Sequence, residues 1–201
     1  MRGLRPNVRV WYDSTRAADQ TQAQAAVAAL DGAIWPTLIT TLGFKEPLTD
    51  AALTCNGGDG RLDIYIVPNM VERGMTTPAA PSGNASEVFI AIQDGLAGDS
   101  LLYPVTHHFM HAIEWSYSMA APQASYGWMR NALANWAVEA VYPGNPLLLA
   151  DAACHMNSNF LPINSQAAGA CTNDASRSRD HGAYLLYQYI GRTSGNTKVR
   201  E

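Results

Sequence analysis

The sequence predicts an α+β fold in a single domain. Short segments rich in β-branched and aromatic residues lie in the first half of the chain, and longer segments with helical periodicity fill the second half. Strands that come first and helices that follow are typical of α+β proteins. The chain has 201 residues, of which 47% are hydrophobic, which is enough for one core. We expect an α/β part over about residues 1–98 and a helical part over about 99–201.

Three segments predict the strands of the sheet. They cover residues 8–12 (VRVWY), 62–67 (LDIYIV) and 87–92 (EVFIAI). The segment 68–86 between the last two is rich in Pro, Gly, Asn and Ser, and we expect it to be a loop.

Five segments predict helices, over residues 18–42, 100–119, 127–141, 146–156 and 181–190. Pro36 should kink or split the first of them, because proline lacks the amide hydrogen that a helix needs. Gly43 should end it. Residues 157–179 are polar and irregular, and we expect a loop there.

Composition excludes several classes of partner. Charged residues make up 15% of the chain and the net charge is −4, with no basic cluster that would favour nucleic acid or an anionic membrane surface. No apolar run is long enough to cross a bilayer. A low lysine content with many Ala, Asn, Ser, Tyr and Trp favours a secreted or extracytoplasmic protein. The chain shows no signal peptide, and we expect a fragment of a longer secreted protein.

The three cysteines allow two interpretations. Cys154 and Cys171 flank the predicted polar loop, and a disulfide between them would contribute roughly 3 kcal/mol. Cys55 would then be buried or paired with a cysteine outside this chain. The alternative is three reduced thiols.

The segment 106–114 carries the strongest chemical signal. His107 and His111 are four residues apart, so they lie on one face of a helix, where both imidazoles reach one metal ion. Glu114 is nearly on the same face and would be a further ligand or an acceptor for an imidazole N–H group. His108 would point into the same cleft. Pairs of histidines at this spacing also occur by chance, but three of only five histidines fall here, which favours a metal site.

Residues 105–115 (VTHHFMHAIEW) resemble the active-site helix of gluzincin-type zinc metallopeptidases, whose motif is H-E-x-x-H. Residues 127–143 (GWMRNALANWAVEAVYP) resemble the second helix of secreted bacterial members of that family. The preceding strands and the segment HGAYLLYQYI are similar as well, so the resemblance covers about residues 8–190 in the same order. It implies a zincin-like fold, a zinc ion, and a peptide or protein as substrate or ligand.

The resemblance also identifies two departures. It implies that His107 and His111 are metal ligands, that position 108 carries the general base, and that position 131 carries the third ligand. The family has glutamates at the last two positions, where this chain has His108 and Asn131. Asn131 offers only a neutral oxygen. His108 would be either a third nitrogen ligand or a general base. Neighbouring helical residues diverge by about 100°, so we expect a cleft residue rather than a ligand.

Further histidines and a tyrosine follow in the second half. His181 and Tyr184 lie near the start of the last predicted helix, where we expect them to face the cleft and stabilise an oxyanion. The alternative for His181 is a surface position at a helix N-terminus. His155 should be a solvated loop residue rather than a ligand.

Three functions are compatible with these patterns. The first is a metallohydrolase that cleaves a peptide or another carbonyl bond, with His108 assisting. The second is a catalytically inactive zincin-like scaffold that binds a peptide or a partner protein. The third is a metal-binding protein without hydrolytic activity, and a three-histidine site would bind copper more tightly than zinc.

Overall fold

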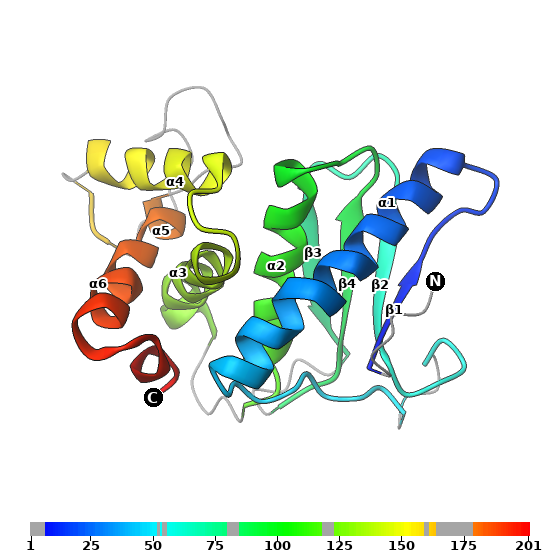
Figure 1. Ribbon diagram of the computed structural model, residues 1–201, viewed down its shortest axis with the longest axis horizontal. Coiled ribbons are helices and arrows are strands. Elements are labelled where there is room, and N and C mark those ends of the chain that lie inside the picture. The colour runs from blue at the N-terminus through cyan, green and yellow to red at the C-terminus, as the bar shows by residue number, and fades with distance from the viewer. Residues whose placement is uncertain are drawn as a thin grey trace.

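The chain forms a four-stranded sheet and a set of helices, which confirms the predicted α+β class (Figure 1). The computed structural model describes residues 7–51, 53, 56–79, 85–117, 123–158, 161–163 and 179–201. Among these residues no helix combines the length and the apolar character that a membrane span requires.

The sheet has the strand order β1-β2-β4-β3. The three predicted strands are confirmed as β1 (Val8–Trp11), β2 (Leu62–Val67) and β4 (Val88–Gln93), and they run parallel. Strand β3 (Gly74–Pro78) pairs antiparallel with β4 and forms one edge.

Strand β3 corrects the prediction of a loop over residues 68–86. The glycine and proline content suggested a turn, but both residues suit an edge strand. Pro78 ends the strand, where a missing amide hydrogen costs little. Gly74 lies where a side chain would collide with His108. Residues 80–84 lie outside the described part.

The first predicted helix is confirmed, but it changes its winding instead of splitting at the proline. Helix α1 (Ala17–Ala29) continues into two π-helical segments, Leu30–Ile34 and Pro36–Thr41. The wider turns accommodate the proline, which cannot make the regular α-helical hydrogen bond. Gly43 follows with a φ of 73°.

The remaining helices are α2 (Asp99–Glu114), α3 (Gln123–Val141), α4 (Pro146–Asn157), α5 (Arg179–Gly182) and α6 (Tyr184–Ser194), followed by a 3₁₀ turn at Asn196–Arg200. Helix α2 is shorter than the predicted 100–119, because the chain leaves the helix after Glu114. The last predicted helix is divided at Ala183. Most of the predicted loop 157–179 lies outside the described residues.

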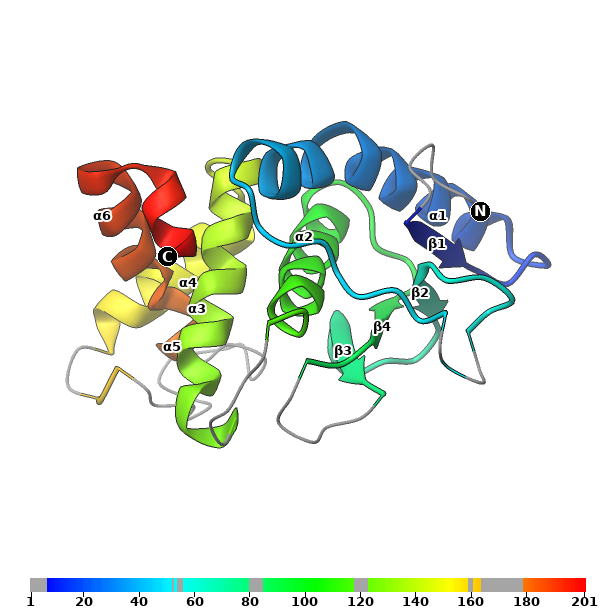
Figure 2. The same ribbon diagram turned by 90° about the horizontal axis from the view of Figure 1, so that it is seen from below.

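Helices α1 and α2 cover the same face of the sheet, and the helical part stands on the other side of α2 (Figures 1 and 2). Ile64, Ile90 and Phe109 are fully buried between the sheet and α2. Trp35 joins them with its ring 5.8 Å from that of Phe109. Helix α2 therefore has one side in the core and another facing α3, and its histidines lie at this junction.

Candidate metal centre

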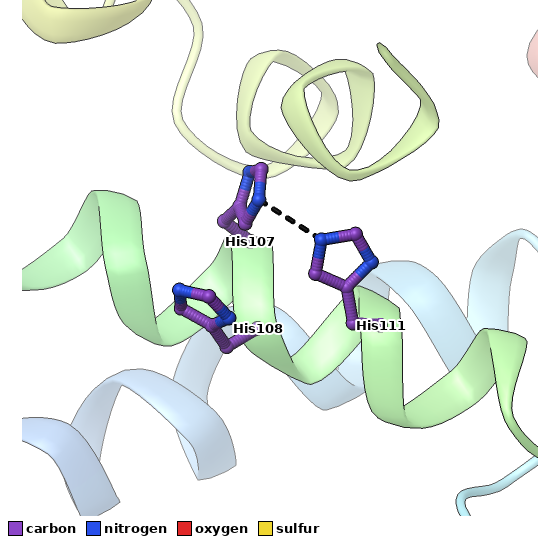
Figure 3. A group of neighbouring side chains, drawn as sticks. All are labelled: His107, His108 and His111. Carbon is purple, nitrogen blue, oxygen red and sulfur yellow. Dashed lines mark hydrogen bonds between the residues drawn. The ribbon is translucent and has the colours of Figure 1, made fainter. Parts of the chain in front are cut away.

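Three histidines of α2 bring their rings together (Figure 3). His107, His108 and His111 each offer one nitrogen, and these nitrogens lie within 4.8 Å of one another. The rings of the adjacent residues His107 and His108 are 5.0 Å apart. Helix geometry led us to expect a cleft residue rather than a ligand at His108, but its ring lies close enough to the other two for the three histidines to hold one metal ion. The backbone directions diverge, but the side chains rotate back toward a common point.

His107 is held by a network on α3. Its Nδ1 lies 2.6 Å from Oδ1 of Asn135, and it is buried. Because an amide oxygen only accepts hydrogen bonds, Nδ1 carries the proton and Nε2 keeps its lone pair. Asn135 donates in turn to Asp151 over 3.1 Å and to the carbonyl of His181 over 3.0 Å. The hydroxyl of Tyr103 lies between the oxygens of Asn135 and Asp151, at 2.9 and 2.8 Å.

His111 is oriented in the same way by a carboxylate. Its Nδ1 lies 2.8 Å from Oε2 of Glu114, which also accepts from Nε of Arg130 over 2.9 Å. The Nε2 atoms of His111 and His107 are 3.0 Å apart. Glu114 is buried and is not one of the three residues whose ligand atoms converge. Of the two roles expected for Glu114, the structure shows the acceptor of an imidazole N–H group, and not a metal ligand.

His108 is fixed from the edge strand. The hydroxyl of Thr76 lies 3.1 Å from its Nδ1 and also donates to its backbone carbonyl over 3.1 Å. Gly74 packs against the other side of the ring, where a Cβ atom would lie 2.6 Å from Nε2. Strand β3 therefore sets the position of the third imidazole.

The surroundings favour the neutral forms of His107 and His108. Burial lowers the pKa of His107 well below its usual value, and the neighbouring His111, His108 and His181 lower it further, while the hydrogen bond to Asn135 opposes this. Burial and two neighbouring imidazoles lower the pKa of His108 in the same direction. Neutral imidazoles have the lone pairs that a metal ion requires.

The cluster opens into a cavity of about 270 Å³ between β3 and the helical part. Glu72 and Arg73 line it from the segment before β3, and Asp151 lines it from α4. His181 lines it as well, with its ring stacked 5.8 Å from that of His107. His181 thus faces the cleft, as expected.

Asn131 also lines the cavity, at the position where the resemblance implied a third ligand. Its amide nitrogen donates to Oδ2 of Asp180 over 2.8 Å. Asp180 is fully buried. The amide group of Asn131 is therefore held by a carboxylate beside the histidine cluster.

Tyr184 does not face the cleft, which corrects the expectation of an oxyanion-stabilising role. It is 4% exposed, packs in the hydrophobic core, and is absent from the described residues around the cavity. Burial, together with the negative charges of Glu139 and Asp151, raises its pKa to about 12. Tyr184 is therefore a core residue of the last helix.

Two further residues lie away from the cluster. Nδ1 of His155 lies 3.0 Å from the carbonyl of Arg179, so His155 is part of the contact between α4 and α5 and not a solvated loop residue. Cys154 is buried on the same helix. Cys55 and Cys171 lie outside the described residues, and the pairing of the cysteines stays a prediction.

Sequence reasoning missed Asn135, Asp180, Thr76 and Gly74. A signal existed for Asn135, because it follows Asn131 by four residues and therefore repeats an amide on the same face of the helix. Thr76 and Gly74 gave no signal, because their segment lacked the pattern of a strand.

Comparisons of the chain with protein-family models, with curated proteins and with solved structures gave no match.

Proposed function

We propose that the chain binds zinc through His107, His108 and His111 and hydrolyses a carbonyl bond, of a peptide or an ester, in the adjoining cavity. The observation that carries this proposal is the convergence of three imidazole nitrogens within 4.8 Å. Acceptors on α2 and α3 already orient two of these rings.

All three residues fit a zinc ion in donor type, and His107 and His111 also fit it in spacing. Zinc–nitrogen bonds of about 2.0–2.1 Å in a tetrahedron separate two ligand nitrogens by about 3.3 Å. The Nε2 atoms of His107 and His111 are 3.0 Å apart, so a small rotation of either ring admits the ion. The Nδ1 partners Asn135 and Glu114 match the hydrogen bonds that metal-binding histidines make with their second nitrogen.

A site with three histidine ligands has the composition of a catalytic zinc centre, which keeps a fourth position for water or substrate. Zinc in such a site polarises a carbonyl group and lowers the pKa of water toward about 7.

The chain's own groups supply the remaining chemistry. With His108 among the ligands, Glu72 is the residue that we assign as proton acceptor. It is exposed, it lines the cavity, and it has no ion-pair or hydrogen-bond partner among the described residues. His181 stacks on His107 at the cavity wall, where its ring can donate to a developing oxyanion.

The resemblance of α2 and α3 to the two active-site helices of gluzincins supports a zincin-like fold as part of the proposal. In this interpretation the ligand set has shifted from two histidines and a glutamate to three histidines. The metal would then keep its full double positive charge, because no carboxylate offsets it.

A second candidate is an inactive zincin-like scaffold that binds a peptide. The bond between Asn131 and Asp180 favours it, because the position of the family's third ligand is committed to a structural contact. A zinc- or copper-binding protein without hydrolytic activity is the third candidate. It shares the same histidines and differs only in the absence of turnover.

The test is hydrolysis of quenched-fluorescent peptides and of a nitrophenyl ester by the zinc-loaded protein. We expect activity that a chelator removes and added zinc restores, and that His111→Ala abolishes. His155→Ala is the matched control, since it removes a histidine outside the cluster. Bound zinc without turnover in either assay would contradict the hydrolase and leave the two inactive candidates, the peptide-binding scaffold and the metal-binding protein.

The zincin-like part of the proposal has its own test. The double variant His108→Glu plus Asn131→Glu restores the family's base and third ligand. We expect chelator-sensitive peptidase activity from this variant if the register of the resemblance is right. A double variant that gains neither zinc binding nor peptidase activity would show that the register is wrong.

A further inference from the structure

A second cavity lies at the sheet, away from the histidine cluster. Side chains alternate along a strand, so Ile64 and Ile90 face the helices while Asp63, Tyr65 and Phe89 face the opposite side. A cavity of about 390 Å³ is present there. Its apolar walls include Tyr65, Phe89, Val88 and Leu53, and its polar groups are the carboxylates of Asp50 and Asp63.

Both carboxylates are buried without a cationic partner among the described residues. Asp63 is 2% exposed and accepts hydrogen bonds from two neutral donors, Nε1 of Trp11 at 2.8 Å and the hydroxyl of Tyr65 at 3.1 Å. Asp50 is 4% exposed, and its Oδ1 has no partner. Arg9, whose charge lowers the pKa of Asp50, is itself engaged by Asp59 and by the carbonyl of Gly57.

The burial of these carboxylates disfavours their charged forms. Burial raises the pKa of Asp50 to about 6, and the charge of Asp63 contributes in the same direction. Two carboxylates therefore line one cavity, and the charge of one raises the pKa of the other. Burying a carboxylate without a counter-charge is unfavourable, so a cation that enters the cavity offsets part of this cost.

The walls indicate what kind of cation fits. The rings of Tyr65 and Phe89 meet edge to face with centroids 6.1 Å apart, and Trp11 stacks on Tyr65 at 6.3 Å. Aromatic rings attract ammonium groups and also pack against apolar stems. Within the described part of the chain, the histidine cluster is the group whose ligand atoms converge closely enough for a metal ion, and it includes neither aspartate. An organic cation therefore fits this cavity better than a metal ion.

We propose that the cavity formed by Asp50, Asp63, Tyr65 and Phe89 is a binding site for a primary ammonium group on an apolar stem. Free amines and the lysine side chains of peptides share this chemistry.

Benzylamine and its neutral isostere benzyl alcohol test the proposal by NMR. The indole N–H signal of Trp11 reports on the site, because that group donates to Asp63; Trp11→Phe assigns it. We expect benzylamine to shift this signal in a saturable way and to bind at least tenfold more tightly than benzyl alcohol. Equal binding of the two probes would overturn the proposal without any variant.

Charge-removing variants test whether benzylamine binding depends on the two aspartates. Asp63→Asn keeps an acceptor for Trp11 and Tyr65 but removes one charge, and we expect at least tenfold weaker binding of benzylamine. Asp50→Asn should weaken binding as well. Glu46→Gln is the matched control, since Glu46 is an exposed carboxylate outside the cavity that accepts a hydrogen bond from Asn7. Unchanged affinity in both aspartate variants would also overturn the proposal.

A last comparison separates the two sources of the ammonium group. Nα-acetyl-lysine methylamide represents a peptide side chain, and butylamine represents a free amine with a similar stem. Tighter binding of the lysine derivative assigns the site to peptides, and tighter binding of butylamine assigns it to free amines. Binding of neither compound would contradict the ammonium site.

Discussion

Oδ1 of Asn135 lies 2.6 Å from Nδ1 of His107 and joins helix α3 to the histidine cluster of α2. Asn135 is fully buried, and its amide nitrogen is anchored on Asp151 and on the carbonyl of His181. One side chain thus connects the cluster to three other helices and fixes the tautomer of a proposed ligand.

Asn135→Ala should weaken zinc binding about 10- to 100-fold, because the ring of His107 loses the acceptor that orients it. Competition with a fluorescent zinc chelator measures the affinity. Asn157→Ala is the control, since Asn157 is exposed at the end of α4. An Asn135→Ala affinity equal to that of the control would show that this hydrogen bond does not support the metal.

His108→Ala should weaken zinc binding far more than Asn131→Ala does. His108 is a member of the converging group, while the amide of Asn131 is held by Asp180. Calorimetric titration of both variants with zinc gives the comparison. The opposite order would identify Asn131 as the third ligand and would support the sequence-based expectation.

Gly74→Ala should also weaken zinc binding, although Gly74 offers no ligand. The added Cβ would lie 2.6 Å from Nε2 of His108 and would push that ring out of the cluster. Gly32→Ala is the control, because a Cβ there meets no atom within 4 Å. In the zinc titration we expect tenfold weaker binding for Gly74→Ala and unchanged affinity for Gly32→Ala.

The metal-free protein should lose stability as the pH falls below about 6.5. The unfolded chain binds protons at His107 and His108 near that pH, while the folded chain, in which their pKa values are lowered, does not. Their contribution to stability is therefore present above the unfolded pKa and is lost toward acid, at up to about 1.4 kcal/mol per pH unit for each group. Urea unfolding with chelator between pH 8 and 5 measures this slope. His107→Gln should reduce it.

Asp50→Asn should stabilise the protein at pH 8. The pKa of Asp50 is raised to about 6, so the folded state binds its proton more tightly than the unfolded state does. Stability from this group is present below pH 3.8 and is lost as the pH rises through about 6. Removing the charge should therefore raise the free energy of unfolding at pH 8 by about 1 kcal/mol or more. Equal stability of the two proteins at pH 8 would contradict the pKa assigned to Asp50.

The sequence predicted the α+β class and the strands β1, β2 and β4, because their periodicity and composition are local properties. It also predicted that His107 and His111 share one helix face, which follows from their spacing. It did not predict β3, whose glycine and proline resemble those of a turn. That strand is an edge strand specified by pairing with β4 and by contact with His108, and neither contact is visible in a local pattern.

The composition of the cluster could not be predicted for a similar reason. The spacing of His107 and His108 indicates diverging Cα–Cβ directions, but the ring positions depend on Thr76 and Asn135, which come from other elements. Tyr184 shows the converse. Its place at a helix start suggested a cleft residue, but its side chain packs in the hydrophobic core.

Zinc stoichiometry tests the central claim most directly. The protein is stripped with chelator, incubated with a small excess of zinc, separated from free metal, and measured by elemental analysis alongside the single alanine variants of His107, His108, His111 and His155. We predict one zinc per chain for the wild type and for His155→Ala, and loss of zinc in the other three. A wild-type protein without zinc, or a His108→Ala variant that keeps all of it, would contradict the three-histidine site.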